Sequence, residues 1–181
     1  MIYLVIGVIA LLVIYVLVTY NRFVRMKNRV DESFSTMDVY LKKRWDLIPN
    51  IVETVKCYTK HEKSTLSEVI ELRNGAYDNM SSDEKIKANQ QLSKEITKIM
   101  ALAEQYPDLK ANENFKDLST QLIKIEDEIA NSRKYYNGTV RELNDKVQMF
   151  PSNIVANIFG YKAKAMFEAN KEEKKNVKVS F

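Results

Sequence analysis

The feature that most constrains this chain is a seven-residue apolar repeat between positions 115 and 150. Each member of the repeat is apolar or aromatic, and the series runs Phe115, Leu122, Ile129, Tyr136, Leu143 and Phe150. A repeat of this length predicts one long helix with a buried seam. At 1.5 Å per residue, such a helix spans roughly 50 Å. Because a single helix cannot cover its own seam, the rest of the chain must supply neighbouring helices.

Composition supports an all-helical protein. The 181 residues include only four glycines and three prolines, so the chain has few breaks. The formal net charge of +4 is small, and no basic cluster is interleaved with aromatic residues. We therefore expect no nucleic-acid partner. Cys57 is the single cysteine, which excludes an intrachain disulfide and fits a reducing compartment.

Residues 1–21 carry no charged side chain and are long enough to cross a hydrocarbon core of about 30 Å. A cleaved signal peptide would need a basic start and a small-residue cleavage site, and neither is present. We predict a permanent single-pass anchor in the inner cell membrane. Four basic residues follow at once, and we call them the membrane collar: Arg22, Arg25, Lys27 and Arg29. By the positive-inside rule, the amino terminus lies outside and the main domain lies in the cytoplasm.

After the anchor, apolar residues in steps of three and four predict a helix from Phe23 to about Asn74. Pro49 either kinks this helix or lies in the first turn of a new one. Because the apolar stripe keeps its phase across Pro49, a kinked, continuous helix is favoured. The apolar side chains of residues 30–41 need a segment to pack against, and three alternatives remain. The chain folds back as a hairpin at Pro49, the C-terminal segment covers them, or a second protomer does.

Local signals predict the later boundaries. Ser81 and Glu84 have the spacing of a capping box, and Asn112 is placed to cap the long central helix. Phe150-Pro151 is expected to end the central helix, and residues 153–159 read as a short helix stopped by a glycine. The predicted organisation is an anchor at 1–21, a helical bundle at 22–170 and an extended tail at 171–181.

One group of side chains resembles a reactive site. Cys57 and His61 are four residues apart and form one helical line with Glu53. A thiolate–imidazole pair is a potential nucleophile, and all three side chains can bind zinc. With one His and one Cys in the chain, a closed zinc site would need two carboxylates or a second chain. We predict no catalytic residue, no metal site and no cofactor, with Cys57 packed as a small apolar side chain.

A polar stripe runs beside the apolar seam of the central helix. Its members are spaced 7, 4 and 7 residues apart, and the first helix offers three possible mates. Polar residues near a seam fix helix register and partner choice, so we predict a structural network. No Glu-x-x-His motif supports a ferritin-like metal centre. Tyr135 and Tyr136 are expected to bury their rings. The predicted network consists of Arg44, Glu62, Arg73, Glu126, Arg133, Asn137 and Asn144.

Several stretches together resemble the LemA family of bacterial membrane-anchored proteins. They include residues 38–50 (DVxLKKRxDLIPN), residues 106–115 (YPDLKANENF), the polar stripe and the ending VxVxF at 177–181. The resemblance covers nearly the whole chain. It implies an N-terminal transmembrane helix followed by an antiparallel four-helix bundle, related in shape to bromodomain-like bundles. It implies no enzymatic activity, because the family has none established.

The expected function is therefore that of a membrane-anchored, non-catalytic scaffold or interaction protein. Its expected partners are the lipid bilayer, unidentified membrane or cytoplasmic proteins, and a second copy of the chain. Two alternatives stay open. The membrane collar is suited to anionic headgroups, which favours a lipid-binding or membrane-shaping protein. The Cys57–His61 pair favours a metal protein.

Overall fold

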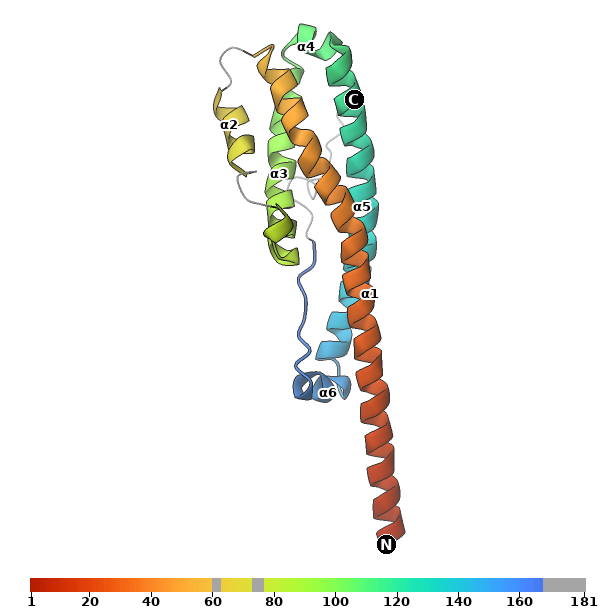
Figure 1. Ribbon diagram of the computed structural model, residues 1–181. Helices are drawn as coiled ribbons and strands as arrows, with labels where there is room; N and C mark the ends of the chain where they lie inside the picture. The colour runs from red at the N-terminus through yellow and green to blue at the C-terminus, as the bar shows by residue number, and fades with distance from the viewer. Residues whose placement is uncertain (60–62, 73–76, 168–181) are drawn as a thin grey trace, which may run out of the picture. The chain divides into compact units, whose positions relative to one another are not determined.

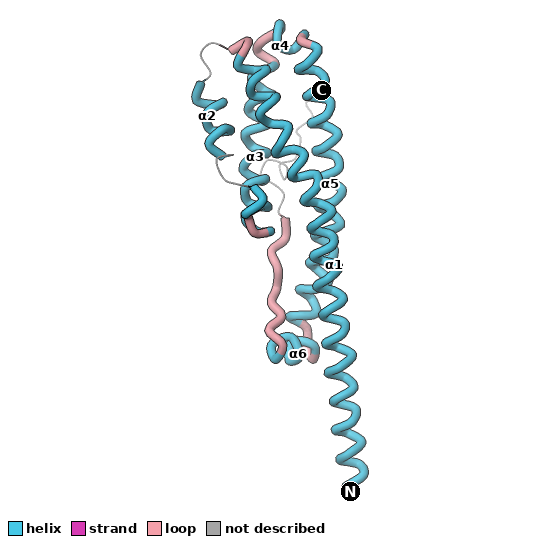
Figure 2. Tube along the Cα trace, viewed as in Figure 1, coloured by secondary structure: helices cyan, strands magenta, loops and turns pink. Residues whose placement is uncertain are grey.

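A computed structural model describes residues 1–59, 63–72 and 77–167 of the chain (Figure 1). This part is all-α, as predicted, and Figure 2 shows it as helices joined by loops and turns. In chain order, its elements are α1 (Ile2–Lys56), α2 (Lys63–Leu72), the 3₁₀ turn η1 (Tyr77–Asn79), α3 (Ser82–Ala103), α4 (Pro107–Ala111), α5 (Glu113–Gln148) and α6 (Ser152–Ile158).

The chain forms two compact units, each of which takes part of α1 and part of α5. Unit 1 comprises residues 1–36 and 132–166. Within the described chain, unit 2 comprises residues from 37–131 together with Phe167.

In unit 1 the second half of α5 packs against α1. Val30 of α1 and Val140 of α5 are fully buried, and the ring centroids of Phe34 and Tyr136 lie 5.8 Å apart. The stretch of α1 around Val30 and Phe34 is thus covered in part by the central helix, a partner that periodicity alone did not identify. Helix α6 lies beside α1, and the N-terminal part of α1 extends beyond it (Figure 1). After α6, Gly160 adopts a left-handed backbone with φ of 73°, as a helix stop requires.

In unit 2, α1, α2, α3 and α5 run side by side and alternate in direction (Figure 1). This is the predicted antiparallel four-helix arrangement. Its core is apolar and draws on three long helices: Leu41, Trp45 and Ile48 from α1, Leu92 and Ile99 from α3, and Leu122 and Ile129 from α5.

The predicted caps are present. The Ser81 hydroxyl accepts a hydrogen bond from the Glu84 amide at 3.4 Å, and the Ser81 amide donates to the Glu84 carboxylate at 2.8 Å. The side-chain oxygen of Asn112 accepts from the Phe115 amide at 3.0 Å at the start of α5. Pro49 lies inside α1, so the helix is continuous across the proline, as favoured.

Two predicted features are wrong. The first helix ends at Lys56 instead of Asn74, because the polar stretch that follows offers almost no apolar surface to bury. The seam residues from Phe115 to Leu143 are at most 4% exposed, but Phe150 is 78% exposed. Phe150 leaves the seam because α5 has already ended at Gln148. The predicted tail at 171–181 lies outside the described residues.

Candidate functional site

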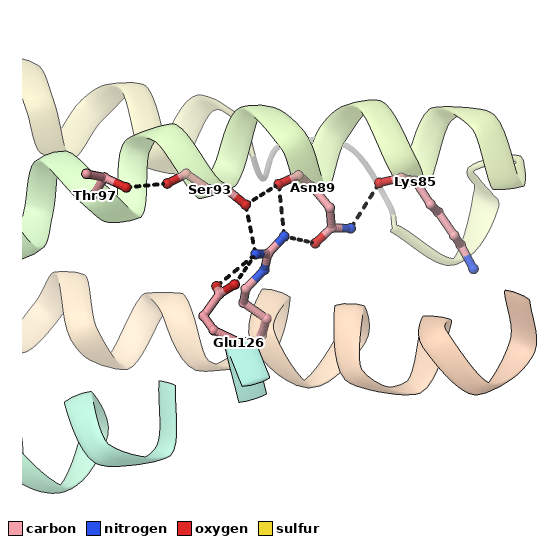
Figure 3. A network of polar contacts seen from close by, with 6 residues as sticks. Lys85, Asn89, Ser93, Thr97 and Glu126 are labelled. Carbon is pink, nitrogen blue, oxygen red and sulfur yellow. Dashed lines mark hydrogen bonds and ion pairs between the residues drawn. The ribbon is translucent and has the colours of Figure 1, made fainter. Parts of the chain in front are cut away.

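The main polar site of unit 2 is built around Arg44, whose side chain is only 1% exposed. Its Nη1 atom donates to the carboxylate oxygens of Glu126 at 2.8 and 3.0 Å and to Ser93 Oγ at 2.8 Å. Its Nη2 atom donates to the backbone and side-chain oxygens of Asn89, both at 2.9 Å. One guanidinium from α1 therefore holds α3 and α5 together (Figure 3).

Helix α3 presents its share of the site through a ladder of side-chain to backbone bonds (Figure 3). Asn89 Nδ2 donates to the Lys85 carbonyl at 3.0 Å, and Ser93 Oγ donates to the Asn89 carbonyl at 3.0 Å. These local bonds hold the acceptor groups of α3 in the positions that Arg44 contacts. The arrangement suits a buried cation, which needs several polar partners in place of water.

A second polar cluster in unit 2 surrounds Asp38 on α1. One carboxylate oxygen accepts from the Tyr77 hydroxyl at 2.6 Å, and the other accepts from Lys85 Nζ at 2.6 Å. The Tyr77 ring also packs beside the Trp45 ring, with centroids 5.2 Å apart. Burial raises the pKa of the Tyr77 phenol, and the negative charge of Asp38 raises that pKa further. This cluster ties the short turn η1 and the start of α3 to α1.

In unit 1, polar side chains of α5 form hydrogen bonds with backbone groups of the segment that follows α6. Asn144 donates to the Lys164 carbonyl at 2.9 Å and accepts from the Lys164 amide at 2.8 Å. The Tyr136 hydroxyl donates to the Ala165 carbonyl at 3.1 Å, as expected of a buried tyrosine at a seam. Tyr135 is exposed, so its predicted burial is wrong. It faces away from the seam because it precedes the seam residue Tyr136 by one position.

The predicted network is thus divided between two separate places. The structure brings Arg44 and Glu126 together in unit 2, whereas Asn144 binds the backbone in unit 1. Arg133 and Asn137 each have an interaction within the described chain. The remaining two predicted members, Glu62 and Arg73, lie outside the described residues.

Sequence reasoning missed the α3 side of the site. Asn89 is fully buried although it is polar. It falls three residues after Ile86 and three before Leu92, so it lies within the apolar stripe of α3. A polar residue inside an apolar stripe is the signal that would have indicated a buried hydrogen-bonding partner for Arg44.

The membrane collar is exposed on α1 in unit 1. A shallow hollow lies on this surface, and Arg29 at its edge forms an ion pair with Glu142 at 3.3 Å. The two side chains of this pair are each 57% exposed. The hollow is lined by Val18, Arg22, Arg25, Met26, Arg29 and Glu142.

The thiol group that resembled a reactive centre lies at the end of α1. Cys57 is exposed, so the expectation that it packs as a core side chain is wrong. It follows the last residue of the helix, where the Sγ atom donates to the Glu53 carbonyl at 3.3 Å. His61 lies outside the described residues. Within residues 1–59, 63–72 and 77–167, no cluster of three or more His, Cys, Asp or Glu side chains is placed to hold a metal ion.

The fold and these sites define an all-helical protein with an apolar N-terminal helix and a bundle joined by a buried arginine. Residues 33–181 match the family model described as the LemA family, and the chain belongs to this family. The described helix α1 contains a candidate membrane span near its N-terminus.

Three relatives extend this comparison. The chain is 27% identical over 164 aligned residues to Protein LemA of Metamycoplasma hominis, covering 88% of this chain and 74% of that protein. It is 25% identical over 178 aligned residues to the magnetosome proteins MamQ 1 and MamQ 2 of Paramagnetospirillum magneticum, covering 84% of this chain. The match spans about 65% of the length of each MamQ protein.

Proposed function

We propose that this protein is a non-catalytic helical scaffold held in the cell membrane by residues 1–21. The observation that carries the proposal is the exposure of the first part of α1. Nearly every large apolar side chain from Met1 to Val18 is exposed, whereas packing against other parts of unit 1 begins near Thr19. Exposed apolar surface on this scale marks a membrane or protein contact, and a helix of this length suits a bilayer.

The polar sites support a structural role. Both Nη atoms of Arg44 are engaged by groups on α3 and α5, and the Asp38 carboxylate is engaged by Tyr77 and Lys85. These contacts join helices to one another. A scaffold needs such fixed helix pairing, because its binding surfaces must keep their shape.

The orientation follows from the membrane collar. Its four basic residues come directly after the uncharged run, which favours an external amino terminus and a cytoplasmic helical domain. The proposed partners are the lipid bilayer and membrane or cytoplasmic proteins, with self-association as a further binding mode.

Cys57 provides a natural reporter for anchor and orientation because it is exposed and is the single cysteine. The full chain should stay in the membrane pellet after alkaline carbonate extraction. A membrane-impermeant maleimide should label Cys57 in permeabilised cells and leave it unlabelled in intact cells. Release by carbonate would overturn the anchor, whereas labelling in intact cells would overturn the orientation alone.

The scaffold role is tested by photocrosslinking in native membranes. Ile123 is exposed on α5 in unit 2, so a photoreactive residue there should capture a reproducible set of protein neighbours. The same group at the buried neighbour Leu122 should capture only the chain itself. Stoichiometric zinc in the purified protein that disappears in Cys57→Ser would instead support the metal-protein alternative.

A further inference from the structure

The segment from Met149 to Tyr161 contains no charged side chain, although 29% of the whole chain is charged. Within α6, Ile154 and Ile158 are four residues apart and share an exposed face, while Val155 and Ala156 are buried. Soluble proteins seldom leave so many neighbouring apolar side chains uncovered. We call the exposed side chains of this segment the α6 patch: Met149, Phe150, Ile154, Ile158 and Phe159.

Aromatic contacts within unit 1 fix the α6 patch beside the end of the anchor. The Phe159 ring lies 4.7 Å from the Tyr20 ring, centroid to centroid. The Tyr161 ring stacks on the Phe23 ring at 4.8 Å with an interplanar angle of 18°. Tyr20 is the second-to-last residue of the uncharged run 1–21. The end of α6 therefore lies beside the last residues of the uncharged run, and the rest of that run extends beyond α6 (Figure 1).

The side chains at this level are those that a lipid surface favours. Tyrosine is enriched at membrane interfaces, where its ring is apolar and its hydroxyl is hydrated. The exposed basic residues Arg22 and Arg25 follow Tyr20 on α1, and the exposed Lys162 follows Tyr161. Cations that directly follow exposed aromatic and apolar residues suit a lipid surface, because the cations contact anionic headgroups while the apolar residues contact the acyl chains.

We propose that the α6 patch is a second membrane contact, which enters the interfacial layer of the same leaflet that the anchor crosses. This inference rests on the proposed anchor. An amphipathic segment of this kind buries its apolar face about 5–10 Å into the boundary between headgroups and acyl chains. A single transmembrane helix leaves the domain free to tilt relative to the membrane plane. A second contact at α6 removes that freedom and holds unit 1 at one tilt to the membrane.

The experiment uses the full chain in vesicles of phosphatidylcholine and phosphatidylglycerol. Cys57→Ser removes the natural thiol, and one new cysteine per variant carries an environment-sensitive fluorophore. The test positions are Ile158→Cys and Met149→Cys. The matched control is Tyr135→Cys, because Tyr135 and Met149 are both 57% exposed. The two positions are 14 residues apart, which is about 20 Å along a helix axis. Leu12→Cys reports the anchor itself.

Lipids with spin-labelled acyl chains should quench the fluorophore at positions 158, 149 and 12, with a blue shift of emission. The fluorophore at position 135 should stay unquenched and unshifted. Quenching at 12 without quenching at 158 and 149 would overturn the α6 contact and leave the anchor standing. Absence of quenching at 12 would overturn the anchor as well. A blue shift at 158 without lipid quenching would show a protein cover, such as a second copy, and would also overturn the proposal.

Discussion

Unit 2 buries a charged side chain among its helices, whereas unit 1 buries neutral hydroxyl groups. In unit 2, the Arg44 guanidinium is matched by a carboxylate and an amide. In unit 1, the buried hydroxyls of Ser33 and Thr139 lie 2.9 Å apart, and each also lies 2.8 Å from a carbonyl oxygen of its own helix, so one proton per hydroxyl is shared between these acceptors. A buried charge requires its partners, while a hydroxyl can turn to a local carbonyl. Helix pairing is therefore more strictly specified in unit 2.

Removal of the carboxylate partner of Arg44 gives the largest expected effect. Glu126→Ala leaves the guanidinium buried without its counter-charge. We expect a loss of about 3 kcal/mol in the free energy of unfolding, at the low end of the usual range because Glu126 is 38% exposed. Trp45, the single tryptophan, is buried in unit 2, so its fluorescence during urea unfolding reports this loss.

The control replaces both members of the pair with apolar residues. Arg44→Met combined with Glu126→Leu leaves no buried charge and should recover most of the lost stability. If the double variant were as unstable as Glu126→Ala, the damage would come from lost packing or from the buried Asn89 side-chain oxygen, which loses its donor together with Arg44. The claim that a buried charge specifies helix pairing more strictly than buried hydroxyl groups would then be contradicted.

Asn144→Ala is expected to destabilise unit 1 locally by about 2 kcal/mol, since two hydrogen bonds to the Lys164 backbone are lost. Hydrogen exchange in peptides covering residues 161–167 should become faster, while exchange in α3 stays unchanged. Asn144→Asp keeps the acceptor and loses the donor, so its effect should be intermediate. Unchanged exchange in Asn144→Ala would show that the segment is held mainly by other contacts.

Tyr77→Phe removes the hydrogen bond to Asp38 and should cost about 1 kcal/mol near neutral pH. Its effect should depend on pH, because burial raises the pKa of the Tyr77 phenol in the folded state. The unfolded phenol ionises near pH 10, so wild-type stability falls as the pH rises beyond that value. The phenylalanine variant lacks this contribution, and the stability difference between the two proteins should narrow. Trp45 fluorescence can follow both proteins, and a constant difference would contradict the assignment.

Local signals explain what could be predicted from the sequence. Ser81 and Asn112 form their capping hydrogen bonds within three residues of their own positions, so these caps could be predicted from local sequence. The seam from Phe115 to Leu143 was readable because helical periodicity places those residues on one face. The same periodicity placed Glu126 beside the seam, but it contained no information on which helix would supply the opposite charge.

The rest depended on pairing between distant segments. Periodicity showed that Val30 needed cover, but the covering residues near Thr139 lie more than 100 positions further along the chain. The end of α1 at Lys56 was also missed. A continuous helix was expected across a polar stretch, but helical stability comes mainly from burial of an apolar face, which this stretch lacks.

The smallest effect is expected at the exposed ion pair of unit 1. Glu142→Gln removes the partner of Arg29, but both side chains are 57% exposed and water can replace the contact. We expect a change within about 0.5 kcal/mol, measured as hydrogen exchange of residues 132–148 in α5. The change should shrink further in high salt, because exposed charges are screened. A loss comparable to that of Glu126→Ala would mean that unit 1 also depends on a specific charge pair. The two units would then differ in how many charge pairs they contain. Burial of a pair would no longer explain its contribution to stability.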